Sequence, residues 1–433
     1  MISLKKYWYY YLLGLAVITV ILFEVHHQND FDIFLWASKD LLKHKDIYNV
    51  EYNLWYHYYY GILFALILIP FTFLPISLVK TIWLFANVFF VYRIWRILKG
   101  FLPVSRLTRP YAILFVCFSF LFMMKFLRDN FHHGQMTICM LYLALEGLSL
   151  IRSEKRLAGS LLIALGIDIK LLPVILIPYF IYRREWRSVF YIILFLVIIV
   201  VLPVLFLGYD YIVILLKSRI ALLDPFSQRH IVDADETSFH SLSTLIATLC
   251  MKTINDPHIL PIRRNIFDLT VNQLNIVINT LRLFFILLSA WFLRSWPFRT
   301  FSSRIQVLYE IGYLFILVPL LFPHQQQYAY FFIFPAATYM VFVLIYHLNM
   351  KKQKSEVLSQ SSEKFLIIML VLIYFLTNCY FILGQFEDFY NHFKFLTYGA
   401  LLLVLVLALY PPKAVGFDHS GRSDDNRMGG KLP

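Results

Sequence analysis

Long apolar runs alternate with short polar segments along most of the chain. The stretch at 189–208 reads VFYIILFLVIIVVLPVLFLG, and a helix of this length crosses a hydrocarbon core of roughly 30 Å. Similar runs predict spans at residues 7–25, 59–76, 78–98, 110–126, 134–151, 157–182, 187–208, 268–293, 305–322, 327–348, 364–383 and 394–410. Backbone polar groups of a lipid-exposed segment must be satisfied internally, so we expect these spans to be helical. The pattern predicts an all-α polytopic membrane protein with about twelve transmembrane helices.

The composition agrees with this pattern and excludes a soluble globular domain. Of the 433 residues, 60% are hydrophobic and 15% are charged, and the mean hydropathy is +0.68. A soluble domain is closer to half apolar and a quarter charged. The end of the chain differs, because residues 411–433 are polar and contain glycine. We therefore expect one transmembrane domain at 1–410, followed by a disordered cytoplasmic tail.

The formal net charge of +13 does not indicate nucleic-acid binding, because the cations gather at the ends of apolar runs. Cytoplasmic loops of membrane proteins carry this excess of Lys and Arg. Lys5 and Lys6 then place the N-terminus inside and the loops at 26–58 and 209–262 outside. Two alternatives remain for the middle of the chain. Two spans within 59–98 put several arginines outside, against the expected excess of Lys and Arg in cytoplasmic loops. One crossing of 59–98, together with a break of 157–182 at Lys170, agrees with that expectation.

Chemistry is expected in the first outer loop. The spacing of Phe34, Ala37, Leu41 and Leu42 predicts an amphipathic helix lying in the membrane interface. Asp30 and Asp32 come just before these positions, at the depth where a lipid-linked substrate presents its phosphate and sugar. Each aspartate is either a solvated loop acid or helix N-cap, or a general base that takes a proton from an acceptor hydroxyl. Their placement favours the second interpretation.

Lys170 lies within the apolar stretch LLIALGIDIKLLPVILIPYF, two residues after Asp168 and three before Pro173. A cation at the middle of a membrane helix costs about 2.5–3.5 kcal/mol on insertion scales, so it suggests a function. Lys170 either reaches the interface or pairs with Asp168, or it binds the phosphate of a lipid-linked donor and stabilises the charge that develops there.

Histidine and glutamine stand at the mouths of two spans, in FHHGQ at 131–135 and FPHQQQY at 322–328. His324 is a candidate to bind phosphate when protonated or to hydrogen-bond a sugar. His132 and His133 have no third ligand at metal-binding spacing, and the four cysteines show neither metal spacing nor a disulfide framework. We therefore expect no metal and no cofactor.

Taken in order, these segments resemble glycosyltransferase family 87, the polyprenyl-phosphate-mannose-dependent mannosyltransferases of the GT-C fold. The segment DFDIFLWA at 30–37 is similar to the family's Asp-Phe-x-Val-Tyr-x-x-Ala, and IPFTFLP at 69–75 is similar to its apolar run before Leu-Pro. The resemblance continues through Gly134–Gln135, through Gly159, Gly166 and KLLP at 170–173, and through HSL at 240–242 and FPHQQQYAYFFIFPA at 322–336. Tyr60–Gly61 departs from an expected Tyr-Pro-Pro.

The resemblance implies a GT-C fold and an inverting transferase of the plasma (inner) membrane with an extracytoplasmic active site. Its substrates are a polyprenyl-phosphate-linked sugar, such as mannose or another hexose or pentose, and a glycolipid or glycan acceptor. Asp30 is implied as the catalytic base and Asp32 as the alternate. Lys170 and His324 are candidates to bind the donor phosphate. Candidate substrate contacts are Gln135, His240 and Gln325.

Three other classes are weighed against this one. A lipid-linked sugar flippase or transporter usually shows internal repeats and helices broken at the midplane, and the sequence shows no repeat. A polymerase or ligase of surface polysaccharide shares the donor class but not an acidic motif directly after the first span. A receptor-like or structural membrane protein gives no reason for Lys170 within an apolar run.

Overall fold

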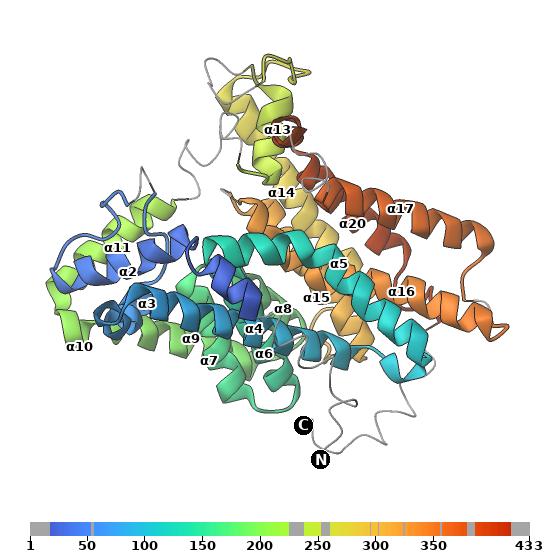
Figure 1. Ribbon diagram of the computed structural model, residues 1–433, viewed down its shortest axis with the longest axis horizontal. Coiled ribbons are helices and arrows are strands. Elements are labelled where there is room, and N and C mark those ends of the chain that lie inside the picture. Colours follow the sequence, from blue (N-terminus) through green and yellow to red (C-terminus); the bar gives the residue numbers. More distant parts are fainter. Residues whose placement is uncertain are drawn as a thin grey trace. The chain divides into compact units, whose positions relative to one another are not determined.

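The computed structural model describes residues 18–52, 56–224, 238–252, 260–294, 296–301, 303–323, 325–355, 357–378 and 386–416. Across these ranges the regular structure is helical, and the only β pairing is two isolated bridges, Tyr52–Tyr56 and Phe239–Gln326 (Figure 1). Seven of the described helices are long and apolar enough to cross a membrane. The chain is therefore an all-α membrane protein, as predicted, and the count of about twelve spans stays a prediction.

The chain forms two compact units. Unit 1 comprises Met1–Trp95, Arg128–Val174 and Arg187–Leu223, and unit 2 comprises Arg96–Leu127, Ile175–Trp186 and Asp224–Pro433. Most of the predicted tail, 417–433, and part of the predicted second outer loop, 225–237 and 253–259, lie outside the described residues. Helices α4 (Ile76–Phe101) and α5 (Arg109–His133) each contribute several residues to both units.

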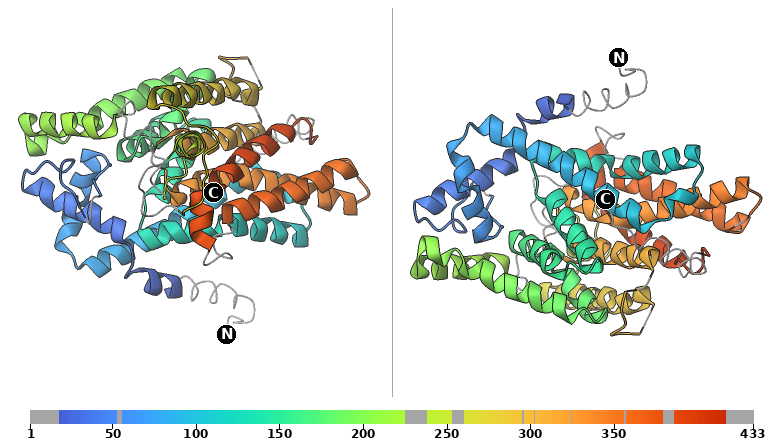
Figure 2. Two further views of the ribbon diagram at one scale, coloured as in Figure 1. Left: turned by 90° about the horizontal axis from the view of Figure 1, so that it is seen from above. Right: turned by 90° about the horizontal axis from the view of Figure 1, so that it is seen from below.

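Unit 1 contains the described part of the segment predicted to be the first outer loop. Its other helices are α2 (Asn29–Leu42), α3 (Ile62–Leu68), η2 (Ile69–Phe73), α6 (Thr137–Arg152), α7 (Arg156–Ile169), α9 (Trp186–Val201), α10 (Val204–Leu207) and α11 (Tyr209–Leu223). The predicted amphipathic helix is α2, which packs against α3 and η2 (Figure 2). Phe34, Ala37 and Leu41 are buried, whereas Leu42 is exposed, so the apolar face ends one residue earlier than predicted.

The predicted span at 157–182 is interrupted at Lys170. Helix α7 ends at Ile169, Lys170 is extended (φ −154°, ψ 134°), and the next helical turn, η4, covers Leu172–Ile175. A proline ring clashes with the carbonyl four residues earlier, and Pro173 therefore accounts for the end of α7 at Ile169. The break occurs at Lys170, the residue at which the distribution of Lys and Arg between the two sides of the membrane allowed an interruption.

Glycines let α6 and α7 approach closely in unit 1. A Cβ added at Gly147 would lie 2.8 Å from the carbonyl oxygen of Gly159, and one added at Gly159 would lie 2.5 Å from that of Gly147. Membrane helices commonly pack through small residues in this way, because close backbone contact replaces the hydrophobic driving force that lipid removes. This packing fixes α7, which ends beside Lys170.

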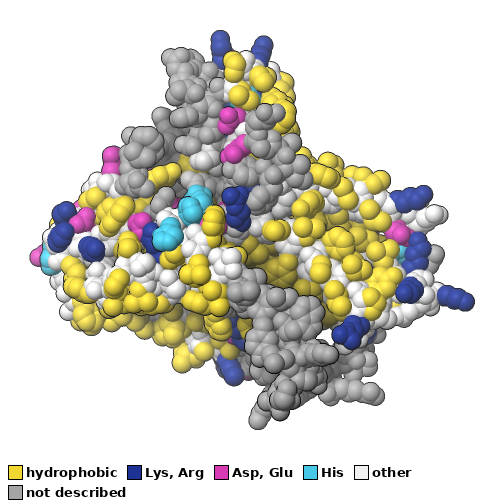
Figure 3. Space-filling model, in the orientation of Figure 1, with side chains coloured by type: hydrophobic (Ala, Val, Ile, Leu, Met, Phe, Trp, Pro, Cys, Tyr) yellow, Lys and Arg dark blue, Asp and Glu magenta, His cyan; other side chains and the backbone are white. Residues whose placement is uncertain are grey.

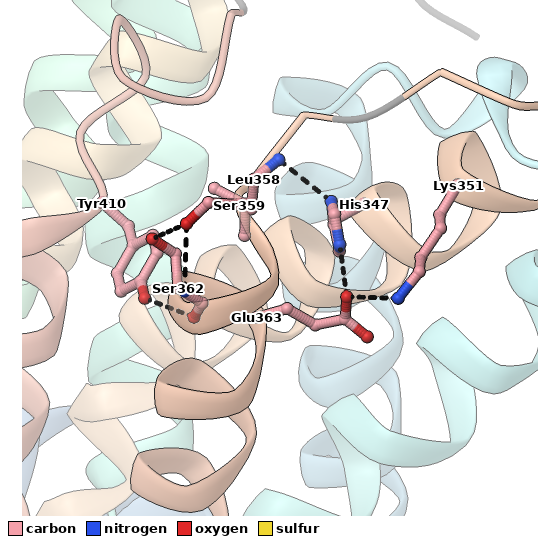
Figure 4. Close-up of polar contacts among 7 residues, drawn as sticks. All are labelled: His347, Lys351, Leu358, Ser359, Ser362, Glu363 and Tyr410. Atoms are coloured by element: carbon pink, nitrogen blue, oxygen red, sulfur yellow. Dashed lines mark hydrogen bonds and ion pairs between the residues drawn. The ribbon is translucent and has the colours of Figure 1, made fainter.

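Unit 2 has a core of two helices that are buried on all sides. These are α15 (Arg304–Leu321) and η5–α16 (Gln327–Ile333 and Phe334–Lys352), and in each 89% of the most apolar window is buried. The surrounding elements are α8 (Leu176–Tyr182), α13 (Leu242–Cys250), α14 (Val271–Leu293), α17 (Gln360–Asn378), α19 (Glu387–His392) and α20 (Phe395–Leu409). The chain between α16 and α17 is held by His347, whose Nε2 lies 3.0 Å from Glu363 while its Nδ1 accepts from the Leu358 amide (Figure 4).

Arg183, which follows the apolar helix α8, does not lie in an exposed loop. Arg183 is fully buried in unit 2 and pairs with the equally buried Glu310. Tyr179 also donates to this carboxylate at 2.8 Å and Gln306 at 2.9 Å. Burying a charge requires such pairing and hydrogen bonding, so Arg183 has a structural role in addition to any contribution to topology.

Candidate active site

Asp30 lies in the first turn of α2 and is partly buried. The Gln135 side-chain amide donates a hydrogen bond to Asp30 Oδ2, and the Tyr60 hydroxyl donates to Gln135 Oε1 at 3.2 Å. The second bond fixes which way the Gln135 amide faces, because its oxygen is occupied by Tyr60 and its nitrogen must then face Asp30. Asp30 is not the N-cap of α2, since Gln28 holds that position.

The turn that carries Gln135 requires a glycine. Gly134 has φ +66°, and a Cβ there would lie 2.8 Å from Cβ of Phe31. Trp83 donates from Nε1 to the Gly134 carbonyl at 3.0 Å, and its ring stacks on Phe31 with centroids 5.4 Å apart. The left-handed conformation and the close approach both favour glycine, and together they bring Gln135 against the start of α2.

Burial raises the pKa of Asp30 above its usual value. The charges of His133 and Lys170 and the hydrogen bond from Gln135 act in the opposite direction, because they stabilise the carboxylate. A carboxylate whose burial raises its pKa, while donors and cations stabilise its charged form, suits the role of a proton acceptor.

Asp32 has a different partner. Lys80, near the start of α4, lies with its Nζ 2.9 Å from Asp32 Oδ2, and the two side chains are only 8% and 15% exposed. Residues two apart on a helix do not face each other, which explains why Asp30 and Asp32 meet different groups. Burial still raises the pKa of Asp32, and Lys80 opposes that shift. Asp32 is therefore engaged in an ion pair.

Lys170 lies beside the Asp30 site. Its Nζ is 5.8 Å from the centroid of the Tyr60 ring, within cation–π range, and its charge acts on Asp30. Asp168, the alternative partner considered for Lys170, pairs instead with Arg219 of α11, at 3.2 Å to Oδ1 and 2.7 Å to the Asp168 carbonyl. The interpretation in which Asp168 is the partner of Lys170 is therefore wrong.

Backbone contact joins the Tyr60 and Lys170 segments. The Gly61 amide donates to the Ile169 carbonyl at 3.2 Å, and a Cβ at Gly61 would lie 2.5 Å from the carbonyl oxygen of Asp168. The Tyr48 and Tyr58 hydroxyls donate to the carbonyls of Tyr60 and Gly61, both at 2.8 Å. Only a glycine allows this approach. This is a structural reason for Gly61 in place of the first proline of the family's Tyr-Pro-Pro.

The two predicted outer loops meet within unit 1. From α11, Tyr211 donates to the Lys45 carbonyl at 2.6 Å and Ser218 to Asp46 at 2.5 Å.

Three residues of the site were not predicted from the sequence: Arg219, Tyr60 and Lys80. Tyr60 was visible only as a departure from the family pattern, and Lys80 resembles any cation at the end of a span.

The remaining candidates belong to unit 2. The His240 amide donates to the Gln325 carbonyl at 2.8 Å, and both side chains are buried. The carbonyl of His240 accepts from Thr397 at 2.6 Å and from Tyr330. Burial, followed by the charges of Lys394 and Lys125, lowers the pKa of His240, which favours the neutral form of its ring. His324 lies outside the described residues.

The sequence model of glycosyltransferase family 87 matches residues 58–300, which is more than half of the 433 residues. No curated protein matches the chain. The matched region contains Tyr60, Lys80, Gln135 and Lys170, whereas Asp30 precedes it.

Proposed function

The chain belongs to glycosyltransferase family 87, and we propose that it moves a sugar from a polyprenyl-phosphate donor to a glycolipid or glycan acceptor, with inversion at the anomeric carbon. The observation that carries the proposal is the convergence of Asp30, Gln135, Tyr60 and Lys170. It combines a proton acceptor with a cation, which are the two groups that such a transfer needs.

In the proposed reaction Asp30 takes the proton of the acceptor hydroxyl while the acceptor oxygen attacks the anomeric carbon. The bond between that carbon and the phosphate oxygen breaks, and its electron pair leaves with the lipid phosphate. Because the phosphate leaves as an anion, no general acid is required, and one carboxylate suffices where a glycosidase uses two. Attack opposite the leaving group turns a β-linked donor into an α-linked product.

Lys170 is proposed to bind the donor phosphate. Asp168 is engaged by Arg219, whereas Lys170 lies within electrostatic reach of Asp30, so a phosphate bound by Lys170 would lie beside the proposed base. A cation placed where negative charge develops favours the transition state over the ground state. His324 stays a second candidate for the phosphate, and His240 and Gln325 stay candidates for substrate contact.

Asp30 is proposed as the base in preference to Asp32 because of their partners. Gln135 donates a neutral hydrogen bond to Asp30, which orients the carboxylate without consuming its negative charge. Lys80 forms an ion pair with Asp32 at 2.9 Å, and such a pair makes the carboxylate a weaker proton acceptor. Asp32 is therefore assigned to holding α2 against α4.

The donor class and the location are proposed on the same grounds. The base lies directly after the first apolar run and among the apolar helices of unit 1, which suits a substrate whose lipid stays in the membrane. We propose the plasma membrane, an extracytoplasmic site and a GT-C arrangement of about twelve spans, with mannose or another hexose or pentose as the sugar.

The test is transfer by the purified protein. Radiolabelled polyprenyl-phosphate sugars are incubated with the protein and a total envelope lipid extract, and the product is analysed for its anomeric configuration. We expect label in a glycolipid or glycan with α linkage from a β-linked donor. Transfer only from nucleotide sugars, or a product that retains the donor configuration, would refute the proposed donor and mechanism.

A further inference from the structure

A second group of polar side chains lies next to the Asp30 site. Glu24, His27 and His132 each direct one possible ligand atom into a common space, and these atoms all lie within 4.8 Å of one another. His132 Nδ1 is 2.9 Å from Glu24 Oε2, and His27 Nδ1 is 3.8 Å from the same oxygen. All three residues belong to unit 1.

These distances suit a metal ion. Two ligands of a tetrahedral ion, each about 2.0–2.1 Å from it, lie roughly 3.3 Å from each other, and the separations of 2.9 and 3.8 Å bracket that value. Two histidines and one glutamate form a ligand set used by zinc enzymes, with a fourth position left for water. The contact between His27 Nδ1 and the Phe23 carbonyl is long for a hydrogen bond, at 3.3 Å. It could therefore be exchanged for a bond to a metal ion.

The group is buried on one side and open on the other. Glu24 is 6% exposed, whereas the side chains of His27 and His132 are 41% and 37% exposed. Histidine side chains gather over the start of α2 and the end of α5 in the space-filling view (Figure 3). The two imidazole rings stack with centroids 4.6 Å apart. An ion from solvent can therefore reach a buried carboxylate flanked by two nitrogens.

We propose that Glu24, His27 and His132 bind a divalent transition-metal ion of the Zn²⁺ class. The ion would clamp the chain after the first apolar run to the end of α5. His27 is three residues before Asp30, and His132 is three residues before Gln135, so the clamp holds both members of the hydrogen-bonded pair. The ion is a positioning element, and this part of the inference rests on the proposed function.

Metal binding is measured without any substrate. Tag-free protein is stripped with chelator and titrated with Co²⁺, whose visible absorption reports four-coordinate geometry, and with Zn²⁺ in competition against a chromophoric chelator. We expect about one equivalent to bind. Glu24→Gln and His132→Gln should each weaken binding by more than about 100-fold, beyond the loss caused by removing an outer-sphere partner.

His26→Gln is the matched control, because His26 is exposed and adjacent to a proposed ligand but outside the group. It should bind the ion as the wild type does. No binding by the wild type, or equal binding by all four proteins, would overturn the inference. Two ligand variants, Glu24→Gln and His132→Gln, are used. If gel filtration shows that one of them fails to fold, the other still tests the inference.

The positioning role is tested by sugar transfer. Chelation should lower the turnover of the wild type by about tenfold or more, the low end for a misplaced general base, and Zn²⁺ should restore it in the wild type and His26→Gln but not in His132→Gln. Full activity in metal-free protein would overturn the positioning role of the ion and leave the proposed function standing. Metal binding by a protein that transfers no sugar would support the metal site and refute the proposed function.

Discussion

Replacing Lys80 with methionine removes the cation that pairs with Asp32. The two side chains are 8% and 15% exposed, and Nζ lies 2.9 Å from Oδ2. Methionine keeps much of the length and apolar surface of lysine, so the main loss is the charge. If Asp32 has a structural role, this substitution should destabilise the protein through an unpaired carboxylate, and a second substitution at Asp32 should relieve the defect.

The size of the effect follows from the geometry. At 2.9 Å two unit charges attract by roughly 6 kcal/mol at an effective dielectric constant of 20, and desolvation of both groups offsets part of this. Removing one partner of a buried pair costs about 3–5 kcal/mol. Because Asp32 keeps some access to water, we expect about 3 kcal/mol for Lys80→Met. Lys80→Met/Asp32→Asn should recover much of that loss, since no charge is then left unpaired.

The assay is thermal unfolding of four detergent-solubilised proteins: the wild type, Lys80→Met, Asp32→Asn and the double variant. We expect the melting temperature of Lys80→Met to fall and that of the double variant to return toward the wild type. Two additive decreases would show that the ion pair does not hold the fold. An Asp32→Asn variant that melts normally but loses transfer activity would refute the structural role altogether.

Three further outcomes are expected. Lys170→Met should keep its melting temperature, because Asp168 is paired with Arg219, and should lose about 1.5–3 kcal/mol of donor binding; unchanged donor affinity would contradict phosphate binding. The acid limb of the pH–rate profile should lie above the range of an ordinary aspartate, because burial raises the pKa of Asp30, and activity should fall as the pH falls through it. Gln135→Leu should move that limb to still higher pH, and an unmoved limb would show that another group titrates. Glu51 is exposed, and Glu51→Cys in a cysteine-free background should react with a membrane-impermeant thiol reagent on intact cells. Reaction only after permeabilisation would place the site inside.

Much of the local structure could be predicted because it depends on nearby residues. Apolar runs identified the helices, and the apolar spacing after Asp32 identified α2. Pro173 marks the interruption at Lys170, because a proline ring acts on the turn before it. Gly134 and Gln135 were found through a motif whose glycine is needed at φ +66°.

The pairings could not be predicted, because they join residues far apart in the chain. Asp168 lies close to Lys170 in sequence but pairs with Arg219, 51 residues away. Lys80 and Asp32 are 48 residues apart. His132 had no third metal ligand within reach of its own motif, and Glu24, 108 residues away, lies beside it. Such partners are chosen by how helices pack, and the period of a hydrophobic pattern does not contain that information.

The most direct test of Asp30 as the base is the rate of sugar transfer by Asp30→Asn compared with Asp32→Asn. Asparagine keeps the shape of the side chain and can still hydrogen-bond Gln135, but it cannot accept the proton. We expect Asp30→Asn to melt like the wild type and to lose about 10²–10⁴ in rate, while Asp32→Asn loses far less. Near-normal turnover by Asp30→Asn, with or without a loss in Asp32→Asn, would contradict the assignment of the base.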